Sequence, residues 1–125
     1  MRFSIEILKD KAEKMQKYLE ESPGSEPNDL IDRADKLSIL VAQSGKMLAD
    51  AEWYRDQIVE GTIMDALKKA MEEKLSPSVL NQYIKSVARD YNFLVKWIDR
   101  INATATHQIE AVRSILSYRK AEMVM

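Results

Sequence analysis

The sequence predicts an all-α protein, an elongated helical bundle with one very long C-terminal helix that is completed by oligomerisation. Apolar residues recur at steps of three and four along most of the 125 residues, which is the spacing of one helical face. Neither glycine nor proline occurs from Ser78 to Met125. A helix of about 45 residues would be roughly 65 Å long, which exceeds the diameter of a compact domain of this size. We therefore expect part of it to pack against another copy.

The composition limits the class of protein. Hydrophobic residues make up 46% and charged residues 31% of the chain, which favours a single soluble domain over residues 1–125 and no membrane partner. With 19 Lys and Arg against 20 Asp and Glu, no overall field attracts nucleic acid, so we do not expect it as a partner. The absence of cysteine excludes disulfides, zinc–thiolate sites and thiol nucleophiles, and it fits a cytoplasmic location. The charged N-terminus offers no signal-peptide core.

The first helix is predicted over residues 4–21. Ser4 can cap its free N–H groups, while Phe3 and Leu8 have the spacing of a hydrophobic staple. The apolar positions of its buried face are Ile5, Leu8, Ala12, Met15 and Leu19. A loop over residues 22–28 follows, because two prolines and a glycine there remove N–H donors and loosen the backbone.

A second helix is predicted over residues 29–60. We expect it to stop at Gly61, since glycine easily adopts the left-handed conformation found at helix C-termini. A short third helix then fits residues 62–75, with Thr62 as its cap. Most of its central residues are charged, which indicates a solvated face.

Two polar positions interrupt the apolar seam of the second helix. Ser44 stands beside Gly45, and this small pair favours a close helix crossing, because glycine weakens a helix unless packing requires it. Arg55 has two interpretations. Its stem can snorkel to solvent past Trp53 and Tyr54, or its guanidinium can contact an anion or another ligand.

The last and longest helix is predicted over residues 77–122. Ser76 is a good cap, and Pro77 suits the first helical position. A second stripe, formed by Phe93, Trp97 and Ile101, widens the buried arc in the middle of the helix. The main apolar seam comprises Leu80, Ile84, Val87, Tyr91, Leu94, Ile98, Ile101, Ala105, Ile109, Val112 and Leu116.

Groups that could carry catalysis are few. The chain has one histidine, no cysteine and three glycines, and neither a dinucleotide-binding turn nor a phosphate loop occurs. His107 and Glu110 lie one helical turn apart. Di-metal helical bundles use Glu-x-x-His on two helices, whereas this chain has the reversed order once. We therefore expect no enzyme activity, no catalytic residues, no metal site and no cofactor.

The segment from Asn102 to Tyr118 is the most unusual part of the long helix, because short polar side chains replace the charged surface residues. Threonine and asparagine are mediocre helix formers, so a purely solvated helix would favour Glu, Lys and Gln instead. His107, Glu110 and Ser114 lie beside one polar strip. Helical spacing places in that strip the residues Asn102, Thr106, Arg113 and Ser117.

This strip has two interpretations. It can seal a tight helix–helix interface, in which small polar residues permit close approach and bond across the seam. It can also form a ligand shelf, in which Arg113 binds a phosphate in bidentate fashion and His107 or Tyr118 stacks on a base. A symmetric oligomer would combine the two, because strips that meet at an axis multiply one arginine into several.

The segment from Thr106 to Glu122, THQIEAVRSILSYRKAE, resembles a family of small helical phage and prophage proteins, the phage anti-Thoeris sponges of the first described type. The resemblance covers the C-terminal half and the overall helix layout. It implies a homo-oligomer, from a dimer up to a hexamer, in the cytoplasm of an infected or lysogenic bacterial host. It further implies a small nucleotide ligand, namely cyclic ADP-ribose isomers and also cyclic oligonucleotides, which such a protein sequesters without cleaving.

A sponge needs no catalytic group, but it needs positive and polar contacts shielded from bulk water. We expect Arg113 to provide the main phosphate contact. A second pocket could combine Arg55 with Asn92 and Phe93, although Asn92 also fits a solvated face and Phe93 also fits a core. The supporting polar groups of the first site are expected to be Thr106, His107, Ser114 and Ser117.

The alternative function is a helical oligomeric interaction module of a phage recombination or replication operon. In that case the polar strip only seals an oligomer. The position of Arg113 discriminates between the two hypotheses, because several arginines that face one cavity need an anionic ligand.

Overall fold

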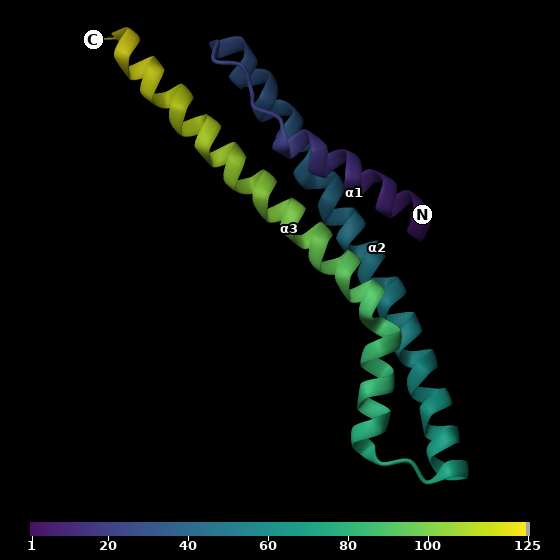
Figure 1. Ribbon diagram of the computed structural model, residues 1–125. Helices are drawn as coiled ribbons and strands as arrows, with labels where there is room; N and C mark the ends of the chain where they lie inside the picture. Colours follow the sequence, from purple (N-terminus) through teal and green to yellow (C-terminus); the bar gives the residue numbers. More distant parts are fainter. Residues whose placement is uncertain (125) are drawn as a thin grey trace.

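The computed structural model describes residues 1–124, and within them the protein is an all-helical bundle, as predicted. It consists of α1 (Ile5–Glu20), α2 (Pro27–Glu73) and α3 (Pro77–Val124). α2 and α3 run antiparallel side by side, and the short α1 lies along the half of this hairpin that is remote from the α2–α3 connection (Figure 1). α2 has 47 residues and α3 has 48, so each is about 70 Å long at about 1.5 Å per residue. The protein therefore has two very long helices rather than one.

None of these helices combines the length and the apolar character that crossing a lipid bilayer requires.

The starts of α1 and α3 follow the expected capping chemistry. The Ser4 hydroxyl accepts a hydrogen bond from the Ile7 N–H at 3.3 Å. The Ser76 hydroxyl accepts one from the Val79 N–H at 3.3 Å, and Pro77 occupies the first helical position. These contacts satisfy backbone donors that a helix start leaves without an internal partner.

The predicted helix break at Gly61 is wrong, because α2 is continuous from Pro27 to Glu73. Glycine weakens a helix by about 1 kcal/mol relative to alanine but does not by itself end it. Instead Lys74 adopts the left-handed conformation, with φ 52° and ψ 46°, and closes the helix. Thr62 is not a cap either: it is buried, and its hydroxyl donates to the Ile58 carbonyl at 2.6 Å.

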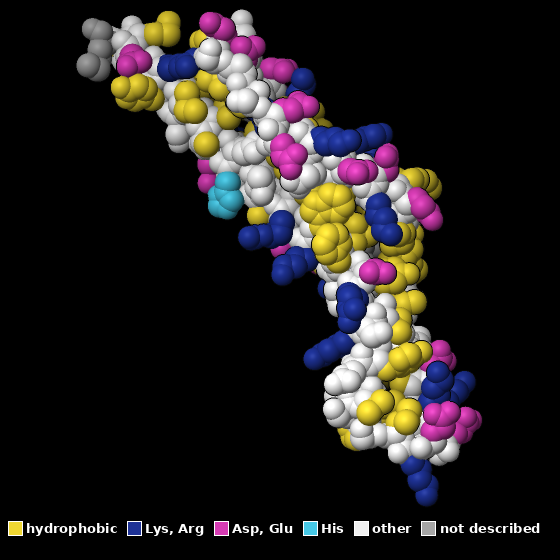
Figure 2. Space-filling view, viewed as in Figure 1, with side chains coloured by type: hydrophobic (Ala, Val, Ile, Leu, Met, Phe, Trp, Pro, Cys, Tyr) yellow, Lys and Arg dark blue, Asp and Glu magenta, His cyan; other side chains and the backbone are white. Residues whose placement is uncertain are grey.

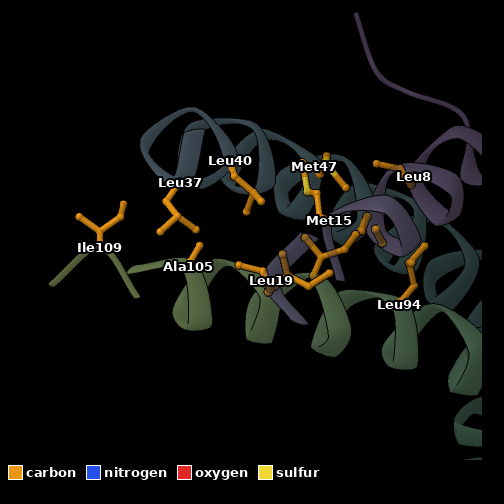
Figure 3. Close-up of a cluster of buried hydrophobic side chains, with 13 residues drawn as sticks. Leu8, Met15, Leu19, Leu37, Leu40, Met47, Leu94, Ala105 and Ile109 are labelled. Atoms are coloured by element: carbon orange, nitrogen blue, oxygen red, sulfur yellow. The ribbon is translucent and has the colours of Figure 1, made fainter. Parts of the chain in front are cut away.

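The hydrophobic core lies where all three helices meet. Figure 3 shows side chains from each of them pointing into one cluster. The core residues labelled there are Leu8, Met15 and Leu19 of α1, Leu37, Leu40 and Met47 of α2, and Leu94, Ala105 and Ile109 of α3. This three-helix region, residues 1–51 with 88–112, contains the buried hydrophobic side chains of residues 1–124 other than Ala66.

The remainder of the α2–α3 hairpin, which we call the distal hairpin, comprises residues 52–87. Within it only Thr62 and Ala66 are buried. Both side chains are small, and larger apolar residues of the distal hairpin such as Ile58, Leu80 and Ile84 are only partly buried. Such a segment cannot derive much stability from its own packing.

A polar cluster attaches the first residues of the chain to α2. The Phe3 N–H donates to Asp50 Oδ2 at 3.0 Å, and the Lys46 ammonium donates to the same carboxylate and to the Met1 carbonyl. Burial alone would raise the pKa of Asp50, but the hydrogen bonds from Lys46 and Phe3 outweigh it and hold the pKa below its usual value. Arg2 lies over the Trp53 ring, 3.6 Å from its centroid. We call this cluster the N-terminal clasp.

Candidate functional site

The polar strip on α3 is divided between a sealed part and an exposed part. Asn102 Nδ2 donates to the Val41 carbonyl at 3.0 Å and to the Ser44 hydroxyl at 2.9 Å. Thr106 Oγ1 donates to the Asn102 carbonyl within the same helix at 3.0 Å. The Asn102 side chain therefore belongs to the α2–α3 packing, whereas the bond of Thr106 lies within α3.

Ser44 and Gly45 do not act as a pair. Ser44 is fully buried and accepts the bond from Asn102. Gly45 is exposed, and a Cβ added there would meet only Asn102 Nδ2, at 4.0 Å. The close α2–α3 contact at this point therefore depends on the serine, while a methyl group at Gly45 would be in ordinary contact.

The amide of Gln108 bridges all three helices. Its Nε2 donates to the Leu19 carbonyl of α1 at 3.0 Å, and its Oε1 accepts from Arg33 of α2 at 2.9 Å. Arg33 is only 5% exposed, and its guanidinium lies over the Tyr18 ring, 4.2 Å from the centroid. Arg33 was not among the candidate residues, because an arginine between the apolar positions Leu30 and Leu37 carries no local sign of burial.

A cleft of about 140 Å³ lies beside Arg33 and Tyr18. Asp29 and Asp32 line it together with Arg33 and Lys36. Lys36 Nζ lies 3.1 Å from Asp32 Oδ2, and that hydrogen bond raises the pKa of Lys36. Because two carboxylates balance two cations, this cleft does not favour a phosphate.

Arg113 lies beyond the sealed part of α3 and is exposed. It forms no ion pair with any residue among 1–124. Ser114, Ser117 and Tyr118 of the same helical segment are exposed as well. An exposed guanidinium can donate two parallel hydrogen bonds to a phosphate or a carboxylate.

His107 projects from the surface of α3, where Figure 2 shows it as the single histidine of the chain. Its Nδ1 lies 3.9 Å from Glu110 Oε2, and both side chains are largely exposed. Among residues 1–124 no three His, Cys, Asp or Glu side chains gather around one point. His107 therefore contacts Glu110, one helical turn away, on the solvent-exposed surface of α3.

The second pocket that the sequence suggested does not form from Arg55, Asn92 and Phe93 together. Arg55 Nε pairs with Asp56 Oδ1 of its own helix at 3.2 Å, and Asn92 is exposed on α3. Neither lines the cleft that contains Phe93. Asn92 and Phe93 are consecutive residues of α3, and consecutive residues of a helix point to different faces.

Phe93 lies instead in a cleft of about 340 Å³ between α1 and α3. Its ring is 68% exposed and stands 6.2 Å from the Trp97 ring. Trp97 Nε1 donates to Gln16 Oε1 of α1 at 3.1 Å. The rest of the cleft is formed by Lys9, Glu13, Asp90 and Leu94. Phe93 is thus not a core residue, and its open ring can stack on a planar group.

No protein-family model, no curated protein and no solved structure matches the chain.

Proposed function

We propose that the protein is a phage or prophage anti-defence sponge of the anti-Thoeris kind. In the cytoplasm of an infected or lysogenic host it would bind cyclic ADP-ribose isomers and cyclic oligonucleotides and withhold them from the defence system without cleaving them. The observation that carries the proposal is Arg113, an exposed guanidinium without a carboxylate partner among residues 1–124. The resemblance of residues 106–122 supplies the ligand class.

The site needs a second copy of the chain. In a single chain Arg113 faces water, where a contact with one phosphate is screened and weak. A homo-oligomer that brings several copies of this helical segment together would shield the arginines from water. Their positive charges would then be uncompensated unless an anion binds. In that assembly Ser114 and Ser117 supply hydroxyl contacts, while His107 or Tyr118 stacks on a base.

The interaction module of a recombination or replication operon remains the second candidate. The bonds of Asn102 to Ser44 and of Gln108 to Arg33 favour it, because they account for polar residues on α3 without any ligand. In this case oligomerisation would require Arg113 for contacts between chains.

Native mass spectrometry of the full chain, purified from a host with an active nucleotide-signalling defence, tests the proposal. The expected result is an oligomer that retains a nucleotide, which denaturation releases with its mass unchanged. Arg113→Ala should keep the subunit number and lose the nucleotide. If the oligomer dissociates when Arg113 is changed and no nucleotide is found in the wild type, the interaction module is favoured instead.

A further inference from the structure

The outer face of distal α2, which points away from α3, carries an uncovered apolar stripe. Met64 is 60%, Leu67 55% and Met71 86% exposed, and Ile63 beside them is 39% exposed. Figure 2 shows hydrophobic side chains reaching the surface along the distal hairpin. Large apolar side chains that cluster on a surface in this way mark contact sites. A helix face that stays in solvent would be expected to carry charged side chains instead.

The spacing of this stripe is that of a helix-pairing seam. Glu60, Met64, Leu67, Met71 and Lys74 follow one another at steps of four, three, four and three. This pattern keeps all five side chains on one face and matches the a and d positions of a heptad repeat. A second helix can therefore pack along the whole stripe with its side chains interlocked.

The charges at the two ends of the stripe favour a particular partner. Glu60 stands at the start and Lys74 at the end, and neither forms an ion pair within residues 1–124. In an antiparallel pair of identical stripes, each glutamate approaches the lysine end of the other copy. A parallel pair would place like charges together, which is destabilising.

We propose that this stripe is the interface between two copies of the chain, packed antiparallel about a two-fold axis near Leu67. Two distal hairpins joined in this way bury the apolar side chains of the stripe between their two α2 helices. The proposal does not depend on the nucleotide function. The stripe lies at the opposite end of the hairpin from Arg113 (Figure 1).

Sedimentation equilibrium of the full chain over a range of concentrations tests the interface. The wild type should associate. Leu67→Glu should weaken association on the order of a hundredfold or more, as expected for a central apolar contact. Ile39→Glu is the matched control, since Ile39 is exposed to a similar degree on the proximal half of α2, and it should leave association within about threefold of the wild type.

A charge exchange keeps the test decisive if Leu67→Glu impairs folding, because Glu60 and Lys74 are exposed. Glu60→Lys and Lys74→Glu should each weaken association, and the double variant should restore it. The chain has no cysteine, so E60C and K74C can also be mixed and cross-linked with a short bifunctional reagent. The cross-link should form between the two variants and not within either one.

A wild type that is monomeric at every concentration would overturn the proposal and assign the stripe to a different protein. Association that Leu67→Glu and both charge variants leave unchanged would also overturn it. Cross-links within E60C alone would replace the antiparallel arrangement by a parallel one.

Discussion

Asn102 of α3 donates a hydrogen bond of 2.9 Å to the hydroxyl of Ser44 on α2, a side chain that is completely buried. Ser44 in turn donates to the Val41 carbonyl at 3.1 Å, so the three polar groups form a connected chain. These hydrogen bonds join the two long helices in the middle of the three-helix region. Within a packed interior such bonds fix the register of one helix against the other.

Replacement of Asn102 by alanine should lower the free energy of unfolding by about 1–2 kcal/mol, since two partly buried hydrogen bonds are lost and a small cavity forms. Chemical denaturation at neutral pH measures this. Asn92→Ala is the matched control, because Asn92 is exposed on the same helix and should cost less than about 0.5 kcal/mol. Equal effects of the two substitutions would contradict a sealing role for Asn102.

Asp50→Ala should destabilise the protein by about 1–3 kcal/mol. The substitution leaves the Phe3 N–H and the Lys46 ammonium without their shared acceptor in a partly buried place. Asp10→Ala is the control, because Asp10 pairs with Lys14 across an exposed helical turn and such pairs contribute under about 1 kcal/mol. The N-terminal clasp would be unimportant if both variants unfolded at the same denaturant concentration.

The effect of Asp50→Ala on the free energy of unfolding should depend on pH. The folded pKa of Asp50 is held below its usual value, so the carboxylate stabilises the fold at any pH above its unfolded pKa, about 3.9. The contribution disappears as the pH falls through the still lower folded pKa. The difference in unfolding free energy between wild type and Asp50→Ala should be constant from about pH 7 to 5 and shrink below about pH 4. A difference that grows with acid would contradict the direction of the shift.

Gly61→Ala should stabilise the protein by about 0.5–1 kcal/mol, because α2 continues through Gly61 and an added Cβ meets nothing within 4 Å. At a concentration where the chain is monomeric, Lys74→Gly should also stabilise it, since Lys74 holds a left-handed φ of 52° that glycine adopts more easily. Thermal denaturation of both variants measures this. If Gly61→Ala instead lowered the melting temperature, the helix would end at Gly61 after all.

Most of the fold could be predicted from local patterns. Ser4 and Ser76 mark the helix starts because capping chemistry is encoded within a few residues. The predicted helix end at Gly61 was wrong because the conformation of a glycine depends on its context. Helix propensity gives a preference of about 1 kcal/mol, and the surrounding helix outweighs it. Lys74 carried no sequence signal for a left-handed residue.

The candidate site was less predictable, because contacts between helices depend on their relative rotation. The sequence placed Asn102 and Arg113 in the same strip, and the structure separates them into a sealed and an exposed part. Burial of Arg33 was not predicted, because no local sequence pattern indicates a buried guanidinium that stacks on Tyr18. Exposure of Phe93 likewise follows from where α1 lies against α3, which the periodicity of α3 alone does not fix.

We propose that Arg113 binds the phosphate of a nucleotide signal. Isothermal titration calorimetry of the folded full chain with cyclic ADP-ribose isomers and with cyclic di- and trinucleotides tests this binding. We expect binding of at least one of these ligands, its loss in Arg113→Ala with the oligomer intact, and its retention in Arg89→Ala, which removes another exposed arginine of α3. Absence of heat with every ligand, or equal binding by wild type and Arg113→Ala, would contradict the claim.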